Sequence, residues 1–177
     1  MSILHLHLLL NHVPVIGIVF ALLLLGVAWM RRSDELGKAA LGLLALLGLV
    51  SIVVFLTGEP AEEIAEQLPG FSETLTERHE EAARVATIVM AASGVLALMA
   101  LWRFRHRALA RWVVPAAMIL SLGAAAPMAY AANLGGMIRH TEIRGTEVPT
   151  SAAPSDDRQS RGSRLAQLTA TIATRGA

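Results

Sequence analysis

The chain has 177 residues, of which 54% are hydrophobic and 16% charged, and its formal net charge is +1. This apolar excess is typical of a membrane protein. The net charge is small and the arginines do not cluster in a stripe that could follow a phosphate backbone, which excludes a nucleic-acid-binding protein. The absence of cysteine excludes disulfides, iron–sulfur clusters, thiolate zinc sites and covalently attached haem.

Four uncharged apolar runs of at least 18 residues follow one another along the chain, at 13–30, 39–57, 85–102 and 112–138. A bilayer core about 30 Å thick is crossed by roughly 20 helical residues, so each run predicts a transmembrane helix. The runs do not alternate in polarity, which excludes strands of a membrane barrel. The first run has no basic start and no cleavage site, so we expect a retained helix rather than a signal peptide. The predicted fold is an all-α bundle of four transmembrane helices.

The connecting segments differ in charge, which predicts their orientation. Residues 31–38 and 103–111 are basic, whereas 58–81 holds eight glutamates against Arg78 alone. Short basic loops stay in the cytoplasm. We therefore expect a multi-pass protein of the bacterial inner membrane, with both termini and the acidic loop outside.

The acidic loop predicts a short helix over 60–68, with proline in its first turn and Pro69-Gly70 after its end. Thr74 and Glu77 have the spacing of a capping box, so the third long helix is expected to begin near Leu75. Residues 145–177 are rich in Ser, Thr, Ala and Arg. They predict a polar, flexible tail after a transmembrane domain of residues 1–144.

Five of the six histidines fall near the outer helix ends, namely His5, His7, His12, His79 and His140. The sixth, His106, lies in a basic inner loop, where we expect it to be solvated, as we do for His5 and His7 at the interface.

We expect His12, His79 and His140 to face the bundle, since the latter two continue stripes of small residues along their helices. Such stripes are typical of tight helix packing, and the alternative interpretation is room for a flat cofactor. Gly135 and Gly136 allow a macrocycle or a neighbouring helix to approach closely. His79 lies near a helix N-terminus, where the helix dipole favours the neutral imidazole that a metal requires.

Glutamates near these histidines are candidates for orienting ligand imidazoles through hydrogen bonds. They are Glu59, Glu62, Glu63, Glu80 and Glu81. The alternative is a solvated acidic loop, in which Glu80 pairs with Arg84 one turn further on.

The chain contains four short motifs: NHVP at 11–14, TGEPAEE at 57–63, RHEEA at 78–82 and GGMIRH at 135–140. With them, residues 3–144 resemble a bacterial family of uncharacterised four-helix membrane proteins that are suspected of binding haem and often occur near respiratory or cytochrome genes. The resemblance implies His12, His79 and His140 as functional positions. Asn11, Gly135 and Gly136, which lie in the same motifs, are candidate cofactor-binding residues.

Three functions stay open. The first is a b-type haem protein in electron transfer, with His79 as the leading axial ligand, His12 as its expected partner, and His140 near the cofactor's polar edge. The second is a non-haem transition-metal site of histidine with Glu59, Glu62 or Glu80. The third is a cofactor-free structural or assembly subunit of a larger membrane complex, such as a respiratory or cytochrome-containing one. The predicted transmembrane runs contain no charged residue, which disfavours a transporter. The sequence also has no nucleophile–base motif of the kind that would indicate an independent enzyme.

Overall fold

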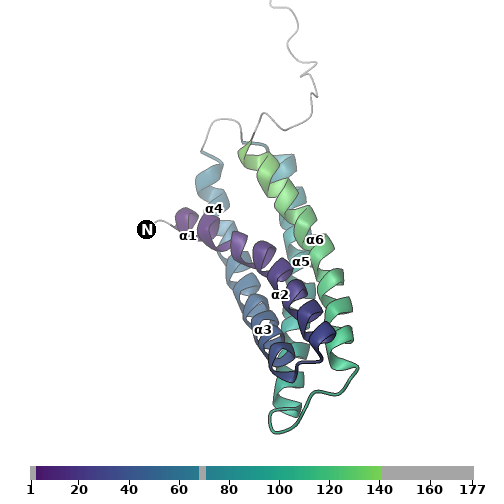
Figure 1. Ribbon diagram of the computed structural model, residues 1–177. Coiled ribbons are helices and arrows are strands. Elements are labelled where there is room, and N and C mark those ends of the chain that lie inside the picture. The colour runs from purple at the N-terminus through teal and green to yellow at the C-terminus, as the bar shows by residue number, and fades with distance from the viewer. Residues whose placement is uncertain (1–2, 68–70, 141–177) are drawn as a thin grey trace, which may run out of the picture. The chain divides into compact units, whose positions relative to one another are not determined.

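The computed structural model describes residues 3–67 and 71–140, and in these ranges the chain is helical apart from short connections (Figure 1). The helices are α1 (Ile3–Leu10), α2 (His12–Arg31), α3 (Asp34–Leu56), α4 (Gly58–Ala65), α5 (Glu73–Arg103) and α6 (Val113–Arg139). The predicted tail at 145–177 lies outside the described residues.

Four helical stretches are long and apolar enough to cross a membrane, which confirms the four predicted spans. They are Ile3–Arg31, Asp34–Ile64, Glu73–Arg103 and Val113–Ile138. At most 33% of the most apolar part of each stretch is buried inside the protein. Most of its apolar surface therefore faces outward, as suits contact with lipid rather than with water.

The four long helices form a closed bundle in which α3 packs against α2 and α5, and α6 packs against α5 and α2 (Figure 1). The helices α3 and α5 approach each other closely. A Cβ atom on Gly48 would lie 3.1 Å from the Cα of Gly94, and a Cβ on Gly94 would lie 3.1 Å from the Cα of Gly48. Two glycines thus bring the backbones into direct contact, as small residues do between membrane helices.

The first membrane stretch is interrupted at Asn11, which forms a turn between α1 and α2. Pro14 has no N–H to donate to the carbonyl of Leu10, so an irregular turn is expected at this point. The helix α1, which precedes this turn, packs against α4, the short helix that follows α3 (Figure 1). The acidic-loop end of the bundle is therefore built by α1, α4 and the ends of α3, α5 and α6.

The opposite end, which carries the basic loops, is held by polar contacts. Asp34 accepts a hydrogen bond from the backbone N–H of Leu109 and forms an ion pair with Lys38 at 2.8 Å. The Lys38 ammonium also donates to the carbonyl of Arg107 at 2.9 Å. These contacts fasten the loop between α5 and α6 to the start of α3.

Two helix starts differ from those expected. The third long helix begins at Glu73, with Ser72 as its N-cap, rather than near Leu75. The Thr76 hydroxyl and backbone N–H both donate to the carbonyl of Ser72, at 3.0 and 3.1 Å, which extends the first turn toward the N-terminus. The short helix α4 begins at Gly58, directly after α3, whereas the sequence placed it at 60–68.

Candidate functional site

The imidazole of His79 is half-buried between α5 and α6. Its Nδ1 lies 2.9 Å from the carbonyl oxygen of Ala131 on α6. A carbonyl can only accept, so Nδ1 carries the proton in this hydrogen bond. In the neutral ring the Nε2 atom therefore keeps its lone pair, which is the form that binds a metal.

Gly135 makes room for this ring. A Cβ atom at Gly135 would lie 3.5 Å from Nδ1 of His79 and 3.1 Å from its Cε1, and the second distance is shorter than normal side-chain contacts. We expected Gly135 to leave space for a macrocycle or a neighbouring helix, and the edge of the His79 imidazole occupies this space. Gly136, the second glycine of the motif, is half-buried beside it.

A second imidazole, that of His7 on α1, is fixed in the same way. Its Nδ1 lies 3.1 Å from Oγ1 of Thr57, and the Thr57 hydroxyl donates its proton to the carbonyl of Val54 at 2.8 Å. With its one proton engaged, the hydroxyl can only accept from His7, and the imidazole also forms a hydrogen bond with the backbone of Val54. His7 on α1 and His79 near the start of α5 both lie at the acidic-loop end of the bundle.

The expectation that His7 is solvated was wrong, because its side chain is half-buried. Helical spacing explains why. Counting back from the buried residues Ile18 and Pro14 at steps of three and four leads to Asn11 and then to His7. The Oδ1 atom of Asn11 on this stripe is buried and has no hydrogen-bond partner among the residues that the structure describes.

His12 does not face the bundle, contrary to expectation. Its side chain is exposed and its Nδ1 lies 3.0 Å from the carbonyl of Leu8 in the preceding turn. His12 lies five positions after His7, and at about 100° per helical position this turns it roughly 140° away from His7 around the helix axis. His140, at the C-cap of α6, is also exposed, as is His106 in the basic loop.

The five candidate glutamates lie on the outside of this end of the bundle. Glu59, Glu63, Glu80 and Glu81 are exposed and Glu62 is half-buried. The predicted pair of Glu80 with Arg84 is confirmed, with 2.8 Å between the charged atoms. In residues 3–67 and 71–140, no three His, Asp or Glu side chains converge closely enough to hold a metal ion.

The structure thus unites at one end His7 from α1, Thr57 from the end of α3, His79 from α5, and Ala131 and Gly135 from α6. Imidazoles that donate through Nδ1 and present Nε2 are the usual form of histidine ligands, because the second hydrogen bond fixes the ring. The donor set of this end therefore fits a group that needs two imidazole ligands.

Comparison with protein-family models found no match, and neither did comparisons with curated proteins and with solved structures. The family resemblance of the four motifs therefore stays a prediction.

Proposed function

We propose that this protein binds a b-type haem at the acidic-loop end of its bundle and takes part in electron transfer. The observation that carries the proposal is the pair formed by His7 and His79. The two imidazoles come from different helices, and each has its Nδ1 engaged in a hydrogen bond. Because the chain has no cysteine, the haem would be held without covalent attachment.

The ligand count favours haem over a single metal ion. A haem iron takes only one or two axial ligands from the protein, whereas a protein-bound zinc ion requires at least three side chains. Groups of three or more suitable side chains do not occur among the described residues. The buried, unpartnered Oδ1 of Asn11 further supports a ligand that brings a hydrogen-bond donor to this end.

The chain's own residues would each have a defined part. Thr57 and Ala131 orient the two rings through their Nδ1 atoms, and Gly135 leaves the space in which the His79 ring lies. Bound haem would supply one-electron chemistry, which the protein's own side chains lack.

The proposed location is the outer face of a bacterial inner membrane. The charge difference between the two sets of loops supports this orientation, since basic loops stay cytoplasmic. A haem at the outer face would be placed to exchange electrons with a respiratory or cytochrome-containing membrane complex.

The test is a reduced-minus-oxidised spectrum with haem extraction on the purified full chain, produced in cells supplied with haem. The wild type and the His12→Ala and His106→Ala variants should contain equal haem, whereas His79→Ala and His7→Ala should lose it. A wild type without haem, or full haem content in the doubly substituted His7→Ala, His79→Ala protein, would contradict the proposal.

A cofactor-free structural subunit is the second candidate. The hydrogen bonds of His7 and His79 each join two separate helices, so both would stabilise the bundle without any ligand. Under this alternative the same substitutions would lower stability, and the wild type would carry no haem.

A further inference from the structure

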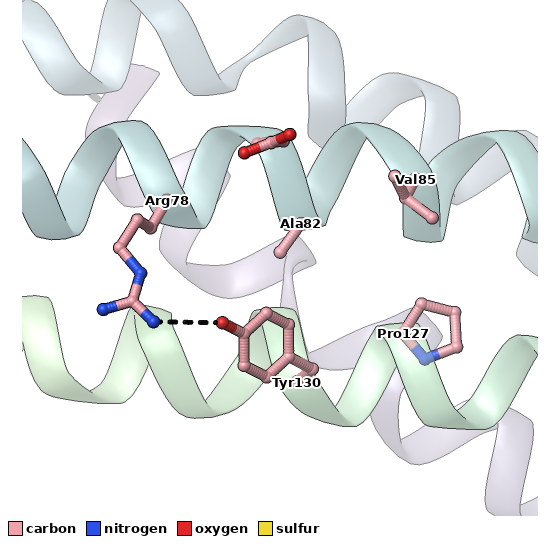
Figure 2. Close-up of a pocket in the computed structure, with 6 residues that line it drawn as sticks. Arg78, Ala82, Val85, Pro127 and Tyr130 are labelled. Carbon is pink, nitrogen blue, oxygen red and sulfur yellow. Dashed lines mark hydrogen bonds between the residues drawn. The ribbon is translucent and has the colours of Figure 1, made fainter.

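A groove of about 260 Å³ lies between α5 and α6, on the outer surface of the bundle near its acidic-loop end (Figure 2). Its lining residues are Arg78, Glu81, Ala82, Val85, Pro127 and Tyr130. None of them belongs to the set that holds the His7 and His79 rings.

The groove is polar at one end and apolar at the other. Arg78 and Tyr130 face each other across it at the end nearer the acidic loop, while Val85 and Pro127 face each other further along (Figure 2). Val85 lies seven residues after Arg78, which is roughly 10 Å deeper along α5. The groove thus changes from polar to apolar in the direction that leads from a membrane surface into its hydrocarbon core.

The two charged side chains of the groove, Arg78 and Glu81, form no ion pair with each other among the described residues. A guanidinium nitrogen of Arg78 donates to the Tyr130 hydroxyl at 3.3 Å, a long hydrogen bond. Glu81 is three residues from Arg78, yet the ion pairs found in the described part of the chain are Lys38–Asp34 and Arg84–Glu80. A cation with a neighbouring hydroxyl donor and a separate anion therefore both face this groove.

We propose that the groove binds a zwitterionic phospholipid whose headgroup carries a primary ammonium, a phosphatidylethanolamine. Arg78 and the Tyr130 hydroxyl would bind the phosphate, and the carboxylate of Glu81 would accept hydrogen bonds from the ammonium. One acyl chain would lie along Val85 and Pro127. This proposal is independent of the haem proposal, because it uses other residues on another surface.

The charge pattern selects among headgroups. An anionic headgroup such as phosphatidylglycerol would satisfy Arg78 but would be repelled by Glu81. A choline headgroup carries the positive charge but has no N–H to donate, and charge-assisted hydrogen bonds are the strong ones. We therefore expect the order ethanolamine, then choline, then glycerol.

The experiment is native mass spectrometry of the full chain in detergent, titrated separately with phosphatidylethanolamine, phosphatidylcholine and phosphatidylglycerol of identical acyl chains. The wild type should bind phosphatidylethanolamine most tightly. Arg78→Gln should weaken that binding about tenfold, as the loss of one charge-assisted hydrogen bond predicts. Glu81→Gln should remove the preference for ethanolamine over glycerol.

Arg84→Gln is the matched control, since Arg84 is a second exposed arginine on α5 that does not line the groove. It should bind all three lipids as the wild type does. Equal affinities of the wild type for the three lipids, or equal binding by Arg78→Gln and Arg84→Gln, would overturn the proposal. Circular dichroism of each variant, with wild-type melting expected for these exposed positions, ensures that a loss of binding reports on the groove.

Discussion

Nδ1 of His79 donates to the carbonyl oxygen of Ala131 at 2.9 Å and thereby links α5 to α6 within the bundle. The link gives His79 a structural contribution through Nδ1 that is separable from any ligand role of Nε2. Replacement by asparagine separates the two, because the asparagine amide reaches about as far as Nδ1 and has no group at the position of Nε2.

We expect His79→Ala to lower the free energy of unfolding by about 1 to 2 kcal/mol through loss of this hydrogen bond. His79→Asn should recover part of that loss and still bind no haem. Thermal unfolding in detergent and haem content measure the two effects. A His79→Asn protein that keeps its haem would contradict a ligand role for this residue.

Gly135→Ala should disturb the same imidazole. The added Cβ would lie 3.1 Å from Cε1 of His79, so the ring must shift. We expect lower haem occupancy than in the wild type. Gly123→Ala is the control on the same helix, because a Cβ there meets nothing within 4 Å. Equal haem content in the two variants would show that the fit of His79 against Gly135 is not required.

Gly94→Ala should destabilise the bundle, because its Cβ would meet the backbone of α3 at 3.1 Å and backbone cannot move aside cheaply. Overpacking of this kind costs about 1 to 3 kcal/mol. Gly42→Ala on α3, where a Cβ meets nothing within 4 Å, should leave stability unchanged or raise it. Thermal unfolding of the two variants side by side checks the prediction, and equal melting temperatures would refute it.

The pH dependence of a bound haem should follow competition between iron and protons for Nε2 of His7 and His79. Neutral imidazole binds the metal, so lowering the pH from about 8 to about 5 should change the haem spectrum and favour release. Titration by visible absorption measures this. His12→Ala should titrate as the wild type does, since His12 is exposed and faces away from the bundle.

Orientation is tested with reporters. A reporter fused after Arg107 should read cytoplasmic, and one inserted between Glu62 and Glu73 should read external, because the first loop is basic and the second acidic. A cytoplasmic signal from the acidic loop would move the histidine pair to the opposite compartment and exclude the proposed outer-face redox role.

The four membrane-spanning stretches could be predicted because lipid exposure requires continuous apolar helices, a property of each segment alone. His79 could be singled out because it lies on a stripe of small residues, and Gly135 because a glycine lets a neighbouring group approach its helix closely. His7 was missed although the signal was present: its register with Asn11, Pro14 and Ile18 places it on the buried side of its helix. The resemblance of the motif at 11–14 implied His12 as the functional histidine of this helix instead.

Other features depend on which helices become neighbours, and no single segment carries that information. The partners of His7 and His79 are Thr57 and Ala131, which lie 50 and 52 residues away in the chain. The contact between Gly48 and Gly94 likewise requires that α3 and α5 be adjacent. Such pairs follow from packing of the whole bundle, and the sequence alone leaves many alternatives.

The contact between Gly48 and Gly94 has a consequence for proton movement through the bundle. Next to it, the hydroxyls of Ser51 and Ser93 donate to carbonyls of their own helices, each at 2.8 Å, and so do not extend toward a neighbour. A proton relay requires a chain of hydrogen-bonded side chains or water molecules. Where the backbones of α3 and α5 are in direct contact, there is no space for such a chain. In the described part of the chain, the contact between α3 and α5 therefore offers no row of polar groups along which protons could pass between these two helices.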